Sequence, residues 1–309
     1  MALERPIRTD PLPITQGDAQ PARPPRGLSS WKNWIGLVPF FAFAIFFLFL
    51  PSFSIVYRSF ESPQHTFTFD NIIAIFTERN LVNAYKASLT VSLITAAGGA
   101  LFGFLLAYAV ILGGLPRSLR TFMTTFSGVA SNFAGVPLAF AFIATIGNAG
   151  LITRWLESAM GFDIHQTGFT IYNIWGLSIV YMYFQFPLMV LIMAPALDGL
   201  RREWREACEN LGGTAFHYWR FIALPVLLPS LLGTAILLFG NAFGAYATAY
   251  AFSGSFINLV TILIGAQIQG DVLYNPGLGN ALALGMVMIM GFCMAGYAWL
   301  QQRTARWIR

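Results

Sequence analysis

Six long apolar stretches alternate with polar segments, at about residues 34–57, 86–112, 121–146, 171–196, 222–252 and 280–301. A helix needs roughly 20 apolar residues to cross a hydrocarbon core of about 30 Å, and each stretch reaches that length. A membrane β-barrel strand would alternate with a period of two, and the run from Phe40 to Leu50 does not. The pattern predicts an all-α polytopic membrane protein with six transmembrane helices, because a lone span must satisfy its backbone internally.

The placement of basic residues predicts the orientation of these helices. Most of the 18 lysines and arginines lie in the N-terminal tail, the second and fourth loops and the C-terminal tail. The other side of the membrane receives only Arg58, Arg79, Lys86 and Arg154. Because cytoplasmic loops carry the excess of Lys and Arg, both termini are expected to be cytoplasmic, which requires an even number of spans.

The composition supports a membrane protein and argues against a soluble one. Hydrophobic residues make up 56% of the chain and charged residues 10%, whereas soluble domains carry about 25% charged residues. The net charge of +5 does not indicate nucleic-acid binding, since Lys and Arg are distributed unequally between the two sides of the membrane. Residues 1–30 are rich in proline and are expected to be a disordered cytoplasmic tail, followed by one membrane domain over 31–309.

The sequence offers no catalytic or metal-binding set of residues. The spans hold almost no charge, and no Ser/His/Asp set, paired carboxylates or clustered Cys and His residues occur beside them. No phosphate-binding P-loop is present either. We therefore expect no enzyme activity, no metal and no cofactor bound by this chain, and any energy for transport must come from another protein.

The fourth loop, residues 198–220, is the most informative polar segment. Asp198 is expected to cap a helix that stops at Gly212 and Gly213, and a second short helix is expected over about 214–220. One interpretation is an amphipathic loop whose basic residues touch anionic lipid. The other is a docking loop for a partner protein, because its aromatic side chains need a cover.

A family resemblance is carried by Glu206, Ala207, Gly212, Ile222, Leu224 and Pro225. This pattern resembles the Glu-Ala-Ala loop of permease subunits in bacterial ABC importers, with Cys208 in the place of the second alanine. The resemblance implies the type I importer permease fold, in a multi-pass protein of the bacterial inner membrane. It implies that the residues coupling the chain to an ATPase are Arg205, Glu206, Ala207, Cys208, Gly212, Phe216, Leu224 and Pro225.

The same resemblance implies a set of partners. They are two cytoplasmic ATPase subunits that hold the ATP, a second permease subunit, a periplasmic solute-binding protein and the lipid bilayer. The second permease is expected to be a related but different chain.

The segment Asn241–Tyr250, together with Asn275-Pro276-Gly277, looks like permeases for polyamines, opines and phosphonates. The resemblance therefore implies a polyamine (spermidine or putrescine), an opine or a phosphonate as substrate. The residues proposed to line the pathway are Asn132, Asn241, Tyr246, Thr248 and Tyr250, together with Ser127 and Ser131. Hydrogen bonding between helices is the alternative role for each of these side chains.

Two other functions fit the same composition. A secondary transporter working without an ATPase would show internal repeats and ion-coordinating residues. No convincing repeat relates residues 34–146 to 171–301. A scaffold subunit that transports nothing would not need the register of the fourth loop.

Overall fold

The computed structural model describes residues 30–161, 170–254, 256–269 and 274–305. The chain divides into two units at Ser52. The described part of the first unit contains α1 (Ser30–Ala44) and the π-helical turn η1 (Ile45–Phe49), after which α2 (Leu50–Ser59) continues into the second unit. The π turn lies directly before Pro51, whose ring excludes a regular helical turn.

The described residues contain six helical segments long and apolar enough to cross a membrane. They are Leu37–Ser59, Arg79–Leu112, Val136–Ala159, Ile174–Asp198, Ala215–Phe243 and Pro276–Gln302. The prediction of an all-α protein with six spans is confirmed. Four of the predicted stretches agree with these segments apart from their ends, whereas the third and fifth were predicted as continuous helices and are interrupted.

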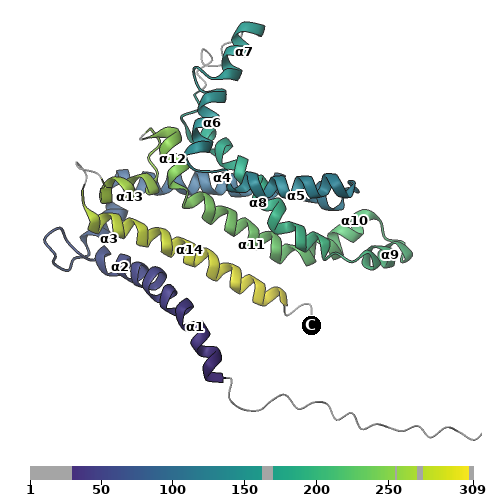
Figure 1. Ribbon diagram of the computed structural model, residues 1–309, viewed down its shortest axis with the longest axis horizontal. Helices are drawn as coiled ribbons and strands as arrows, with labels where there is room; N and C mark the ends of the chain where they lie inside the picture. Colours follow the sequence, from purple (N-terminus) through teal and green to yellow (C-terminus); the bar gives the residue numbers. More distant parts are fainter. Residues whose placement is uncertain (1–29, 162–169, 255, 270–273, 306–309) are drawn as a thin grey trace, which may run out of the picture. The chain divides into compact units, whose positions relative to one another are not determined.

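The core of the second unit lies where α4 (Arg79–Leu112), α8 (Ile174–Asp198) and α11 (Leu224–Phe243) pack together (Figure 1). Glycines on α4 allow α8 to approach closely. A Cβ atom at Gly103 would lie 2.6 Å from the Cβ of Met189, which is itself fully buried. Packing through small residues is the usual way in which helices associate inside a membrane.

The predicted span 121–146 is wrong as a single helix. The structure has α5 (Arg117–Asn132) followed by α6 (Val136–Ile146), and Figure 1 shows α6 and the next helix, α7 (Leu151–Met160), leading away from α5. The break occurs because Gly135 has a φ of 74°, a conformation that glycine adopts without strain. Pro137 then occupies the first turn of α6, where a missing N–H costs nothing.

The predicted span 222–252 is also interrupted. α11 ends at Phe243, and α12 (Tyr246–Ser253) begins after Gly244 and Ala245. The hydroxyl of Tyr181 on α8 donates to the Ala245 carbonyl at 2.7 Å, so the free carbonyl of the break has a partner. The chain then forms α13 (Val260–Gln269) and α14 (Pro276–Ala305), which pack on each other.

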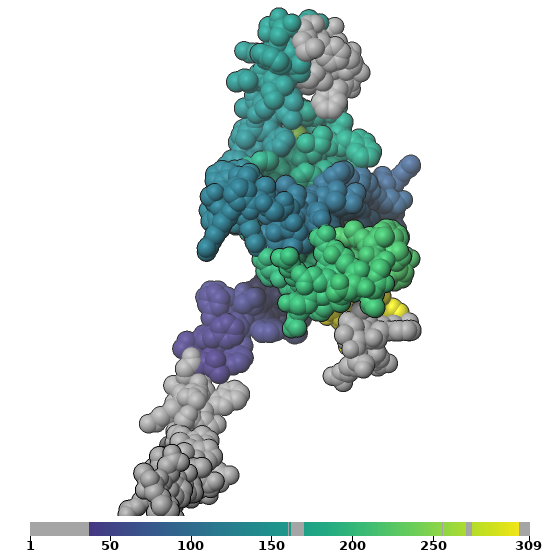
Figure 2. All heavy atoms as spheres, turned by 90° about the vertical axis from the view of Figure 1, so that its right-hand side faces the viewer, coloured from purple at the N-terminus to yellow at the C-terminus, as the bar shows by residue number. Residues whose placement is uncertain are grey.

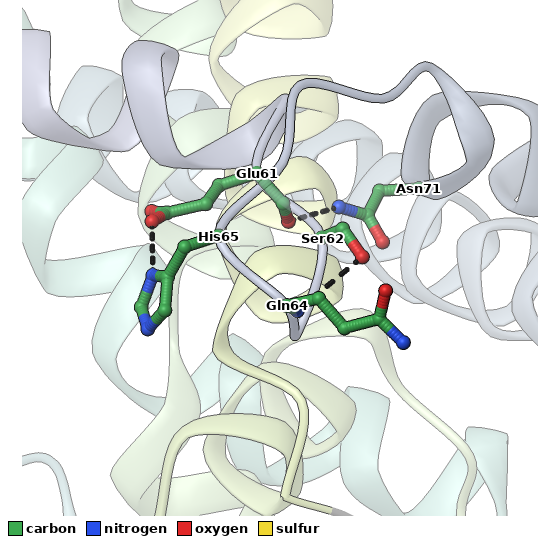
Figure 3. Close-up of polar contacts among 5 residues, drawn as sticks. All are labelled: Glu61, Ser62, Gln64, His65 and Asn71. Carbon is green, nitrogen blue, oxygen red and sulfur yellow. Dashed lines mark hydrogen bonds and ion pairs between the residues drawn. The ribbon is translucent and has the colours of Figure 1, made fainter.

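The segment between α2 and α3 (Asp70–Thr77) forms a compact turn (Figure 3). The side-chain amide of Asn71, which is buried, donates to the Glu61 carbonyl at 2.9 Å. His65 pairs with the Glu61 carboxylate at 2.5 Å, and the Gln64 N–H donates to the Ser62 hydroxyl. These bonds fix the chain reversal between the two helices.

Candidate functional site

The connection between α8 and α11 begins at an ion pair. Nη2 of Arg120 on α5 lies 2.6 Å from both carboxylate oxygens of Asp198, the last residue of α8. The prediction that Asp198 caps the following helix is wrong. That helix, α9 (Arg202–Asn210), begins after Arg201, and no side chain caps its first turn.

Two ion pairs run along α9 at the helical spacing of four residues. Nε of Arg202 donates to Glu206, and Nε of Arg205 donates to Glu209, each at 2.9 Å. The hydrogen bond and charge of the Glu209 carboxylate raise the pKa of Arg205. Such pairs stabilise a helix that has no buried residues of its own.

The helix α9 ends in a Schellman motif built on the glycine pair. Gly212 has a φ of 79°, and its N–H donates to the Glu209 carbonyl at 2.9 Å. The N–H of Gly213 donates to the Cys208 carbonyl at 2.8 Å. These two bonds satisfy carbonyls that the helix end leaves free, and they reverse the chain sharply. The predicted stop at Gly212 and Gly213 agrees with this geometry.

The predicted second short helix is continuous with the fifth span. α10 (Ala215–Tyr218) passes through the π turn η3 (Trp219–Ala223) into α11. The π turn again stands just before a proline, Pro225, and the Leu224 N–H reaches back to the Trp219 carbonyl. At the start of α10, the Thr214 hydroxyl lies 2.8 Å from Nδ1 of His217, whose ring thereby fixes the first turn.

A largely apolar pocket of about 450 Å³ separates α9 from the beginning of the α10–α11 helix. Its wall consists of Trp204, Ala207, Cys208, Leu211, Gly213, His217, Ile222 and Val226. The small residues Ala207 and Cys208 therefore line this pocket, and a larger side chain at either position would fill part of it. Leu211, which belongs to this wall, is 89% exposed.

The aromatic residues of α10 and η3 do not share one environment. Tyr218 is buried, and Trp219 makes an edge contact with Tyr108 near the end of α4, at 5.3 Å between ring centroids. Phe216 and Phe221 are strongly exposed, at 70% and 69%. The loop is thus anchored to α4 by Trp219, and Figure 2 shows this end of the molecule, with the green residues of the connection beside the blue ones of α4 and α5.

The remaining coupling residues, Leu224 and Pro225, lie exposed at the beginning of α11. The structure therefore places six of the eight predicted coupling residues in α9, the glycine turn and α10, and the other two in the first turn of α11. The part that sequence reasoning missed is its anchoring, through Arg120, Tyr108 and the Thr214–His217 pair. In the sequence, the only indication of a role for Arg120 is that it is a basic residue beside the end of another span.

The predicted pathway residues gather at the two helix breaks but differ in burial. Thr248 is buried, and its hydroxyl accepts the Gly135 N–H at 2.8 Å. Tyr246 and Tyr250 stack at 5.5 Å between ring centroids and are partly exposed. Asn241 is exposed on α11, close to the second break.

Asn132, the last residue of α5, is exposed and donates to the Gly128 carbonyl within its own helix. The hydrogen bond between Thr248 and Gly135 therefore joins the two breaks, and it is a contact between helices.

Interrupted helices inside a membrane occur where backbone is buried in protein or lines a cavity. The described residues thus form a helical membrane bundle with two interrupted spans and an exposed helical connection between α8 and α11. The chain belongs to the family of binding-protein-dependent transport system inner membrane components, and the match covers residues 99–309, more than half of its length.

Individual relatives agree with this family. A probable sulfate transport system permease protein of Nephroselmis olivacea is 25% identical over 90% of this chain and 96% of its own. A putative ferric transport system permease protein of Haemophilus influenzae is 21% identical over 84% of this chain and 40% of its own. A bacterial ABC transporter for alginate import shares the fold, with a TM-score of 0.71, 14% identity and coverage of 88% of this chain and 96% of its own.

The protein is therefore a multi-pass membrane permease subunit of an ABC importer, with the type I importer fold. It is not an enzyme, because the ATPase of such a transporter is a separate subunit. Membership of this family decides against a secondary transporter and against a scaffold that transports nothing. The family also implies the inner membrane as its location.

Proposed function

We propose that α9 is the helix through which this permease receives mechanical force from a cytoplasmic ATPase. The observation that carries the proposal is the position of α9. It is exposed, it ends in the Schellman turn at Gly212, and it is joined on both sides to core helices, α8 and α11. A partner that moves α9 therefore moves two spans together, because packed helices shift as rigid elements.

The proposed roles follow from the geometry. Glu206 faces away from the core as half of a pair with Arg202, and Arg205 pairs with Glu209, so both acids are exposed to a partner. Ala207 and Cys208 keep the pocket beside α9 open, and Phe216, Leu224 and Pro225 lie exposed on the adjoining helix. Gly212 supplies the bend that holds α9 away from α11.

The assembly proposed for this chain has two ATPase subunits, which bind the ATP, and a second, related permease chain. A periplasmic binding protein delivers the solute. The alginate transporter supports that last part, since one of its structures is described as a complex with a pentasaccharide-bound periplasmic protein. In this assembly both termini and α9 are cytoplasmic, as the distribution of Lys and Arg indicates.

For the substrate, we infer a small oxyanion such as sulfate. The sulfate permease named above aligns over 90% of this chain, and α4, α11 and α14 contain no Asp or Glu that could hold a polycation. The prediction of a polyamine, opine or phosphonate draws no support from the relatives, whose names give sulfate, ferric and thiamine transport. It stands as the rival outcome of an uptake experiment with labelled sulfate and labelled spermidine.

The orientation of α9 is tested with a single cysteine. Leu211→Cys, in a chain carrying Cys208→Ala and Cys293→Ala, should react with a membrane-impermeant maleimide in inside-out vesicles and not in intact spheroplasts. The matched control is Gln64→Cys in the segment between α2 and α3, an exposed position that the distribution of Lys and Arg places on the other side of the membrane. Labelling of Leu211→Cys in spheroplasts would contradict the proposed role of α9.

A further inference from the structure

An apolar groove lies on the surface between α3, α4 and α14, and none of these helices is close to α9 in the sequence. Its volume is about 370 Å³, within the usual range for ligand pockets. Its lining consists of Ile75, Phe76, Val82, Tyr85, Lys86, Leu89, Gly285, Met288, Ile289 and Phe292. Figure 1 shows these three helices converging at the end where α14 begins.

The floor of the groove is held in place by a buried hydrogen bond. The Tyr85 hydroxyl on α4 donates to the Leu282 carbonyl on α14 at 2.7 Å. Gly285 leaves room for the Tyr85 ring, because a Cβ at this position would collide with the hydroxyl. The walls are open, since Phe76 is 75% and Phe292 is 78% exposed. The groove is therefore a preformed feature with a rigid floor.

One charge interrupts this apolar lining. Lys86 lies seven residues after Arg79, the first residue of α4, or about 10 Å along the helix axis. Its side chain is exposed and forms no ion pair in the part of the chain that the structure describes. A flexible lysine stem at this depth can carry its ammonium group to the lipid headgroups while its methylenes remain on apolar surface.

Neither the first span nor α14 of a second copy of this chain would suit the groove. Its first span, Leu37–Ser59, carries Arg58 as its only charged residue, and the whole of α14 contains no acidic residue. Either helix would bury Lys86 without a negative partner, which is unfavourable in a low-dielectric environment. An anionic phospholipid supplies both an acyl chain for the apolar walls and a phosphate for the ammonium group.

We propose that this groove is a binding site for an anionic phospholipid, with one acyl chain between α3 and α14 and the headgroup phosphate on Lys86. The Tyr85–Leu282 bond and Gly285 give the site its shape, and Lys86 gives it charge selectivity. A lipid held there stabilises the contact of α14 with α4.

The test uses the full-length chain in nanodiscs with equal amounts of phosphatidylglycerol and phosphatidylcholine, followed by native mass spectrometry of the retained lipid. Lys86→Gln should lower the ratio of retained phosphatidylglycerol to phosphatidylcholine about fivefold, the effect of one basic residue on an anionic lipid. Lys86→Arg should keep the ratio. Met288→Trp, which narrows the groove without altering charge, should lower retention of both lipids.

Arg79→Gln is the matched control, since Arg79 is a cation of the same helix outside the groove. An equal loss of selectivity in Arg79→Gln and Lys86→Gln would show a diffuse electrostatic effect and would overturn the site. Unchanged selectivity in Lys86→Gln would do the same. A Phe292→Cys chain that cross-links to a permease partner in native membranes would show that protein, and not lipid, fills the groove.

Discussion

Arg120 and Asp198 lie 78 residues apart in the sequence, yet Nη2 of the arginine is 2.6 Å from both oxygens of the aspartate. Each charge alone is at the unfavourable end of its helix. Arg120 lies in the first turn of α5, where the helix dipole favours anions, and Asp198 ends α8, where the dipole favours cations. Their pairing offsets both effects and ties α5 to the residue from which the chain leaves for α9.

Reversing the charges of Arg120 and Asp198 tests whether the ion pair and the helix dipoles both contribute to stability. Arg120→Gln and Asp198→Asn should each lower stability slightly, with a coupling energy of under about 1 kcal/mol, because the side chains are 37% and 50% exposed. The double variant Arg120→Asp with Asp198→Arg should be at least as stable as the native chain, since both dipole terms then become favourable. Thermal unfolding in detergent provides the measurement. A double variant less stable than either single one would contradict the analysis.

The Schellman turn predicts a difference between glycines of one loop. Gly212→Ala places a Cβ at a φ of 79° and should cost about 1 kcal/mol locally, with reduced uptake. Gly212→Asn should retain more activity, because Asn tolerates the left-handed conformation. Gly199→Ala is the matched control, since φ there is −72° and the new Cβ would meet only ordinary contacts at 3.4 Å. Equal uptake by all three variants would show that transport does not depend on the bend at Gly212.

The number of spans could be predicted because apolar length is a property of the sequence itself. The interruptions could not be placed in the same way, since Gly135 and Gly244 lie within apolar sequence and break the helices for local reasons. Gly135 adopts a positive φ and Pro137 follows it, a combination typical of a helix start. If Gly135 and Pro137 are interpreted as the boundary between two helices, the sequence also predicts the position of the first break.

The coupling residues could be predicted because their pattern is local. Their anchoring could not, because it depends on residues that are distant in sequence. Asp198 looked like a helix cap from its neighbours alone, whereas its partner is Arg120 on α5. Thr248 is predicted either to line the pathway or to bond between helices, and its hydroxyl accepts the Gly135 N–H. Such contacts between helices follow from packing and not from spacing.

Glu206 and Glu209 allow helix stability to be separated from recognition. Both form an i, i+4 pair with arginine at 2.9 Å on the same helix. Loss of either pair should therefore weaken α9 to a similar and small extent, because both pairs are exposed to solvent. If Glu206 contacts the ATPase, Glu206→Gln should lower ATPase recovery during co-purification and Glu209→Gln should not. Glu206→Lys should abolish uptake while membrane insertion remains normal. Equal losses in the two Gln variants would assign Glu206 to helix stability alone.

The bond between Thr248 and Gly135 holds the two helix breaks together, and it should matter for both stability and transport. Thr248→Val keeps the side-chain shape but leaves the Gly135 N–H without an acceptor, which should cost about 1–3 kcal/mol of unfolding free energy. Thr248→Ser keeps the hydroxyl and should lose only about 0.8 kcal/mol for the missing methyl group. Thermal unfolding of the purified chain measures the first effect, and solute uptake in the assembled transporter measures the second. If the breaks move as one unit during transport, uptake should fall with Thr248→Val and recover with Thr248→Ser. A Val variant as stable and as active as the native chain would mean that the two breaks are held by packing alone.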